Sequence, residues 1–199
     1  MPTLYISTTS PYTRILLMIA KTQNIDLSLK FVLPWENPAE LTAANPFSQV
    51  PTLVLDDGSV ITETMLIIQA IAPEIYTAND GKELPAISKA FGILSQGVRA
   101  FSTERFGISG QELHPFVARS KQVLTDTLTA LPTLSADSAT WGDKILLAAL
   151  IWIGTRLPDV FEQLSDANKQ AVAAFANSPL MQQLNSDVLE RLPANIKEL

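Results

Sequence analysis

The sequence contains no cysteine and only one histidine. The absence of cysteine excludes disulfides, thiolate metal ligands and a cysteine nucleophile within the chain. Any thiol chemistry must therefore come from a bound ligand. The single histidine, His114, precedes Pro115 at the predicted start of a helix and has no partner at metal-ligand or catalytic-triad spacing. We interpret it as structural and expect no metal site.

Charge is also scarce, with 17% charged residues and a formal net charge of −6. An acidic chain without a basic cluster is a poor ligand for nucleic acid or for an anionic membrane. The apolar runs are shorter than the roughly 20 residues that span a bilayer, and the N-terminus lacks the pattern of a signal peptide. We therefore expect a cytoplasmic protein. A hydrophobic content of 47% leaves apolar surface for a partner subunit, which favours a homodimer.

The chain is organised around residues 48–64. Two short apolar runs, 52–55 and 60–62, flank Asp57-Gly58, which is the pattern of a tight β-hairpin. The second run passes directly into a helix that we expect over residues 64–72. This segment therefore predicts a hairpin followed at once by a helix.

Pro51 stands directly before the first hairpin strand, where it cannot donate to a sheet and where a cis bond costs little. It also favours an extended conformation at Val50, whose N–H and C=O are then available to an extended ligand. At the start of the helix, Glu63-Thr64 predicts a small anion site made by a Thr N-cap and free backbone N–H groups. An extended ligand with a carboxylate at one end would fit both features.

The first 77 residues predict an α/β domain of the thioredoxin-like kind. Leu4–Ile6 reads as a strand, Ser10 as the N-cap of a helix over 11–23 that begins with Pro11, and residues 26–32 as a second strand. Such a βαβ unit pairs its strands in parallel. A short helix is expected over 39–44.

The remainder of the chain predicts only helices, so we expect a thioredoxin-like α/β domain over 1–77, a polar linker over 78–84 and an all-helical domain over 85–199. Thr140 and Asp143 form a capping-box pattern at the start of one of these helices. The helices are expected at residues 85–105, 112–130, 141–156, 159–177 and 179–191.

Residues 50–64 resemble the glutathione-binding segment of the glutathione transferase family, with its V-P-T-L, D-x-G and E-S elements standing here as Val50 to Leu53, Asp56 to Gly58 and Glu63-Thr64. Thr64 replaces the usual Ser and keeps the hydroxyl. The box at Thr140 is similar to one that the family carries in the central helix of its second domain. The whole chain resembles the bacterial serine-containing branch of the family.

The resemblance implies a hydroxyl that contacts the glutathione sulfur near Ser10-Pro11-Tyr12-Thr13, where thioredoxin-like proteins carry C-P-Y-C. A free thiol has a pKa of about 8.5, and a donated hydrogen bond together with a helix N-terminus favours the thiolate. We take Ser10 as the leading candidate. Thr9 and Ser7 are alternatives, and Ser10 also reads as a helix cap with no catalytic role.

The resemblance further implies that Val50, Pro51, Glu63 and Thr64 bind glutathione, with Gln49 and Trp35 as candidates for its glycine end. Related bacterial enzymes often carry a basic side chain in the Trp35 region, and packing on the surface is the alternative role for Trp35. For the electrophile pocket the candidates are Tyr12, Arg105 and Phe106. Arg99 and Arg105 read equally well as part of a solvated or interface face.

By this resemblance the protein conjugates the glutathione thiolate to an apolar electrophile. The expected homodimer places the hairpin-helix region of one subunit against helices 85–105 and 112–130 of the other. Two alternatives stay open: an inactive relative that serves as a binding or regulatory module, and a glutathione-dependent reductase or peroxidase. The missing cysteine disfavours any reaction through a mixed disulfide with the protein.

Overall fold

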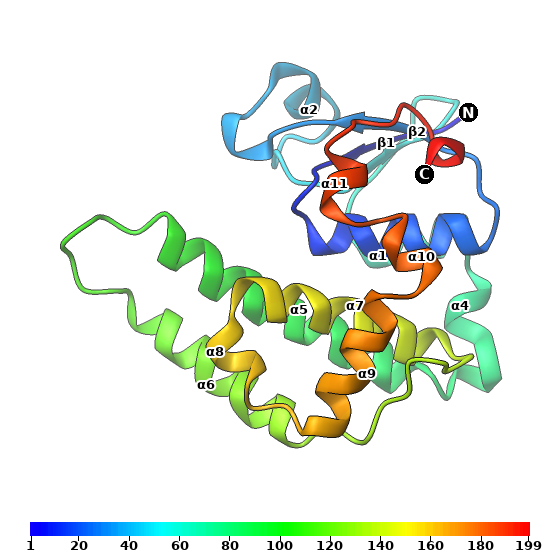
Figure 1. The fold of residues 1–199 in the computed structure, drawn as a ribbon. Coiled ribbons are helices and arrows are strands. Elements are labelled where there is room, and N and C mark those ends of the chain that lie inside the picture. The colour runs from blue at the N-terminus through cyan, green and yellow to red at the C-terminus, as the bar shows by residue number, and fades with distance from the viewer. The chain divides into compact units, whose positions relative to one another are not determined.

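The computed structural model describes residues 1–199, which divide into two compact units (Figure 1). The first unit combines residues 1–78 with residues 178–199, and the second comprises residues 79–177. The boundary falls within η2 (Ala78–Gly81), a turn in which Asn79 and Asp80 both adopt positive φ angles. No helix has the length and apolar character needed to cross a membrane.

The first unit contains a four-stranded mixed sheet with the order β2-β1-β3-β4. The central strand β1 (Thr3–Ile6) pairs in parallel with β2 (Ser28–Phe31) and antiparallel with β3 (Thr52–Val54). β4 (Val60–Ile61) pairs antiparallel with β3 and completes the hairpin. The structure thus confirms the thioredoxin-like fold, the parallel βαβ unit and the hairpin that the sequence predicts.

Helix α1 (Pro11–Thr22) connects the two parallel strands and lies along one face of the sheet (Figure 1). Ser10 is its N-cap and Pro11 its first residue, as predicted. Residues 15–20 form an unbroken run of fully buried apolar side chains. The burial of this whole run explains why the sequence shows no polar face over that stretch.

Short helices complete the N-terminal part of the first unit. The helix predicted at 64–72 is confirmed and ends before Pro73, which cannot continue it. The helix predicted at 39–44 is also confirmed, whereas a turn after β2 and a turn after Pro73 were not predicted. These elements are η1 (Pro34–Glu36), α2 (Ala39–Ala44), α3 (Thr64–Ile71) and α4 (Glu74–Thr77).

The C-terminal segment belongs to the first unit, whereas the sequence predicts an all-helical domain that runs to residue 199. The N–H of Leu29 donates to the carbonyl of Ala194 at 2.8 Å, and the N–H of Ile196 donates to the carbonyl of Leu27 at 3.1 Å. Residues 194–196 therefore cover the outer edge of β2. This pairing is long-range in sequence, so no local pattern predicts it.

The single helix predicted at 179–191 is instead two separate turns, α10 (Pro179–Gln182) and α11 (Ser186–Leu189). The side chain of Asn185 accepts from the N–H of Val188 at 2.9 Å and starts the second turn. Asparagine satisfies backbone groups outside a continuous helix, so it separates the two turns. A final turn, η3 (Ile196–Glu198), follows the residues that cover β2.

The second unit is all-helical, as predicted, and is centred on the buried helix α7. Gly97 allows α5 to approach α7 closely. A Cβ atom at this position would stand 2.6 Å from Cδ1 of Ile153. The helix predicted at 159–177 is two helices, because Ser165 caps a new start by accepting from the N–H of Asn168. The unit contains α5 (Leu84–Arg105), α6 (Pro115–Thr129), α7 (Trp141–Arg156), α8 (Pro158–Phe161) and α9 (Asp166–Ala176).

The start of α7 follows the predicted cap only in part. Thr140 Oγ1 accepts from the N–H of Asp143 at 3.3 Å, as a capping box requires. The Asp143 carboxylate, however, accepts from the hydroxyl of Ser138 at 2.6 Å, and the N–H of Thr140 donates to that same hydroxyl at 3.3 Å. Ser138 therefore takes the second half of the box, which we had assigned to Asp143.

Candidate functional site

The loop before α1 presents the three candidate hydroxyls in different environments. Ser7 is only 6% exposed, Thr9 is exposed and Ser10 is half-buried. Ser10 Oγ accepts from the N–H of Thr13 at 3.2 Å, which confirms its capping role. Accepting this bond does not use the hydroxyl proton, so capping and donation to a ligand sulfur are compatible in one side chain.

Arg14 links this loop to the C-terminal segment. Its Nη2 donates to the carbonyl of Thr8 at 3.2 Å and to Oγ of Ser186 at 2.9 Å. Its Nε donates to the carbonyl of Leu184 at 3.1 Å. The loop that carries Ser10 is thus held in place by residues about 170 positions away, and no sequence pattern predicts this role for Arg14.

A buried asparagine holds the second loop of the site. Asn45 is 1% exposed, and its Nδ2 donates to the carbonyl of Gln49 at 3.1 Å and to Oγ1 of Thr52 at 3.0 Å. Its Oδ1 accepts from the N–H of Phe47 at 3.0 Å. The Thr52 hydroxyl in turn donates to the Gln49 carbonyl at 2.8 Å. No sequence motif marks Asn45, so the sequence does not predict this network.

Val50 and Pro51 follow directly in this loop, and the peptide bond between them is cis. Neither the N–H nor the C=O of Val50 forms a hydrogen bond within the protein. The Gln49 carbonyl before it accepts two hydrogen bonds, and Thr52 after it lies in β3. The Val50 backbone is therefore a pair of unused groups in a fixed position, as the sequence predicts.

The glycine-end candidates lie on neighbouring surface segments. Trp35 is 61% exposed within η1, and Gln49 is exposed in the Asn45 loop. The hydroxyl of Ser48 donates to the carbonyl of Pro34 at 3.1 Å and so joins the two segments. The structure thus brings the backbones that carry Trp35 and Gln49 together.

The start of α3 differs from the prediction by one residue. Glu63 occupies the N-cap position that we had assigned to Thr64, and Thr64 is the first helical residue. Glu63 has φ 68° and ψ 118°, a backbone conformation that residues other than glycine rarely adopt. Such strain costs about 1–3 kcal/mol and is typical of ligand-binding turns. Thr64 itself is 7% exposed.

Glu63 influences the ionisation of Tyr12 electrostatically. Burial, together with the nearby Glu63 carboxylate, raises the pKa of Tyr12 to about 12. The phenol therefore stays protonated over the physiological range, so that it is neutral and able to donate a hydrogen bond. This electrostatic influence connects the first turn of α1 with the turn before α3.

In the helical unit, Arg105 and Phe106 lie at the end of α5 and contact each other, with the guanidinium carbon 5.8 Å from the ring centroid. Arg105 lines an open pocket, whereas Phe106 is 54% exposed and does not. His114 caps α6 through Nδ1, which accepts from the N–H of Phe116 at 3.2 Å. No group of three or more His, Asp or Glu side chains is placed to hold a metal ion.

Comparisons with known proteins show what the chain is similar to. Residues 9–73 match the glutathione S-transferase N-terminal domain family. Glutathione S-transferase stcT of Emericella nidulans is 29% identical over 142 residues, which cover 66% of this chain and 62% of that relative. This chain therefore spans less than two thirds of the relative's length.

Solved structures agree on the fold. A glutathione transferase family member from Pseudomonas fluorescens Pf-5, with bound glutathione, superimposes with a TM-score of 0.79 at 19% identity, covering 93% of this chain and 98% of that one. A glutathione S-transferase from Methylobacillus flagellatus with glutathione bound gives a TM-score of 0.67 at 19% identity, covering 93% and 99%. The chain thus has the fold of these glutathione transferases.

Thr13 generates a prediction about stability. Its side chain is fully buried, and Oγ1 has no hydrogen-bond partner. Thr13→Val removes this hydroxyl at nearly constant shape and should raise the free energy of unfolding by about 1 kcal/mol. Thr52→Val is the matched control, because the Thr52 hydroxyl is equally buried but fully bonded. That variant should lose about 1–3 kcal/mol in urea denaturation. Similar losses in both variants would contradict the assignment.

Tyr12 generates a prediction about pH. An unfolded tyrosine ionises near pH 10, whereas Tyr12 in the native state ionises at about 12. Between these values the unfolded chain releases a proton that the native state retains, so the free energy of unfolding falls as pH rises. In Tyr12→Phe the free energy of unfolding should fall less over this pH range, by up to about 2.7 kcal/mol, than in the wild-type protein. Urea denaturation from below pH 10 to above pH 12 measures the difference. If the free energy of unfolding varied with pH in the same way in both proteins, the prediction would be refuted.

Proposed function

We propose that this protein is a glutathione transferase that conjugates the glutathione thiolate to an apolar electrophile. The observation that carries the proposal is the Val50 backbone, whose N–H and C=O are both unused beside the cis bond to Pro51. A peptide lying alongside can satisfy both groups as an added strand does. Glutathione is a peptide-like ligand of suitable size that also brings the thiol the chain lacks.

In this proposal the remaining groups of the first unit hold the two ends of glutathione. The first-turn N–H groups of α3, with Glu63 and Thr64, bind the γ-glutamyl end, and Gln49 and Trp35 bind the glycine end. Ser10 donates its hydroxyl proton to the sulfur, with Thr9 as the alternative. The positive end of α1 also favours the thiolate. Tyr12, Arg105 and Phe106 are proposed to contact the electrophile.

We assign the chain to the bacterial serine-containing branch and propose a cytoplasmic role in detoxification. A binding or regulatory module remains the alternative, and calorimetry separates the two: no saturable heat at millimolar glutathione would favour that module. A panel of a chloro-nitroaromatic, a hydroperoxide and a mixed disulfide then distinguishes conjugation from peroxidase or reductase activity.

Replacing Ser10 tests the thiolate donor. We expect Ser10→Ala to raise the pKa of bound glutathione by about one to two units towards 8.5, because it removes the hydrogen bond to sulfur. The ultraviolet absorbance of the thiolate reports this pKa. Ser10→Gly separates catalysis from capping, because glycine costs an N-cap only a few tenths of a kcal/mol yet also lacks the hydroxyl. Thr9→Ala should change nothing, and a shift seen only in Thr9→Ala would transfer the role to Thr9.

The homodimer is also a proposal, supported by exposed apolar side chains in the predicted contact regions. Leu66 of α3 is 57% exposed and Val123 of α6 is 40% exposed. The protein should sediment at twice its mass of 21.7 kDa. Leu66→Glu and Val123→Glu should each shift it to the monomer, because they place a charge in an apolar contact. Leu192→Glu, at an equally exposed leucine outside those regions, should not. A monomeric wild-type protein would refute the proposal.

A further inference from the structure

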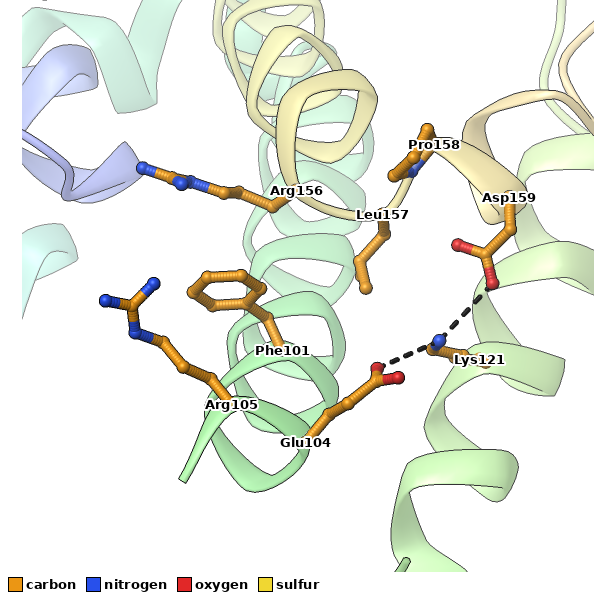
Figure 2. Close-up of a pocket in the computed structure, with 8 residues that line it drawn as sticks. All are labelled: Phe101, Glu104, Arg105, Lys121, Arg156, Leu157, Pro158 and Asp159. Atoms are coloured by element: carbon orange, nitrogen blue, oxygen red, sulfur yellow. Dashed lines mark hydrogen bonds and ion pairs between the residues drawn. The ribbon is translucent and has the colours of Figure 1, made fainter. Parts of the chain in front are cut away.

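The helical unit contains an open pocket of about 340 Å³ at the ends of α5 and α7 (Figure 2). Side chains from α5, α6 and α8, together with the end of α7, form its wall. Because every lining residue belongs to the helical unit, the pocket is a property of that unit alone. The lining residues are Phe101, Glu104, Arg105, Lys121, Arg156, Leu157, Pro158 and Asp159.

On one side of the pocket the only cation, Lys121, is paired with two carboxylates. Lys121 Nζ lies 2.9 Å from Glu104 Oε2 and 3.3 Å from Asp159 Oδ2. Burial alone would lower the pKa of Lys121, but the hydrogen bonds to these two carboxylates outweigh it and the pKa is raised. The lysine is therefore charged and shared between two anions, so this side has no cation to offer a ligand.

The other side carries two cations with no counter-charge. The guanidinium carbons of Arg105 and Arg156 lie 5.9 and 5.3 Å from the ring centroid of Phe101. No carboxylate oxygen lies within 4.0 Å of a guanidinium nitrogen of Arg105 or Arg156. This is so although the chain has 20 acidic residues and a net charge of −6. Figure 2 shows both side chains extending away from Lys121, beside the Phe101 ring.

This arrangement suits a particular ligand chemistry. Arginine presents several N–H donors in a planar fork that matches a carboxylate, and stacking on an aromatic ring holds the fork in place before a ligand arrives. The ring of Phe101, with Leu157 and Pro158, gives an apolar wall beside the two forks. Lysines on a solvated surface would provide neither the orientation nor the wall.

We propose that this pocket binds an organic carboxylate with an apolar body, the carboxylate between Arg105 and Arg156 and the body against Phe101. The binding requires no glutathione and concerns the helical unit only. That this ligand is the electrophile would follow only if the proposed function is correct. Binding of the carboxylate does not depend on the proposed function.

Calorimetric titration of the full chain with phenylpropanoate and with phenylpropanamide tests the proposal. The two probes share their apolar body and differ only in the charged group. We expect the acid to bind on the order of tenfold more tightly than the amide, as hydrogen bonds between charged partners require. Equal affinities, or no saturable heat from the acid at millimolar concentration, would overturn the proposal.

Three variants locate the site. Arg105→Gln and Arg156→Gln should each weaken binding of the acid about tenfold and leave that of the amide unchanged. Arg99→Gln is the matched control, because Arg99 is exposed on the same helix and does not line the pocket. Its affinity for the acid should equal that of the wild-type protein. Equal affinity in all three variants would overturn the proposal.

Two further measurements keep the result interpretable. Neither arginine has a carboxylate partner to lose, so thermal unfolding of the glutamine variants should match that of the wild-type protein. Titration of the same samples with glutathione separates the two proposals. Binding of phenylpropanoate without binding of glutathione would leave this site intact and refute the proposed function, and the reverse result would refute this site alone.

Discussion

The amide group of Asn45 is the constraint on which the candidate site depends. A side-chain amide offers two donors and an accepting oxygen, and Asn45 uses both kinds on the loop that follows it. An apolar residue in its place would leave the Gln49 carbonyl and the Thr52 hydroxyl without their shared donor inside the core. The loop is fixed from its own interior, and the N–H and C=O of Val50 form no hydrogen bond within the protein.

The same contrast between satisfied and unsatisfied polar groups runs through both units. Asn168, 1% exposed, holds the segment before α7 by accepting from the N–H of Leu134 and donating to the carbonyl of Pro132. Such groups are fully paired and therefore structural. The Val50 backbone forms no hydrogen bond within the protein and the guanidinium of Arg105 has no carboxylate partner, and these are the groups from which a ligand can be inferred.

Local signals predicted the parts of the structure that depend on neighbouring residues. Ser10 and Pro11 start α1, and Asp57-Gly58 closes the hairpin, because caps and turns are decided within a few positions. The roles of Asn45 and Arg14 were missed because their partners come together only in the folded chain. Val50, Glu63 and Thr64 could be proposed as site residues because a motif marks them, whereas Arg156 has no motif and its relation to Phe101 needs the helices in place.

The pairing of residues 194–196 with β2 makes the first unit discontinuous along the chain. During synthesis the outer edge of β2 stays open until the whole helical unit has left the ribosome, so the sheet is the last part to be completed although its strands are made first. An unpaired edge strand is a template for aggregation, and the interval of exposure is set by about a hundred intervening residues. Rapid folding of the intervening helices would shorten the flexible chain between β2 and residues 194–196, and so lower the entropic cost of pairing them.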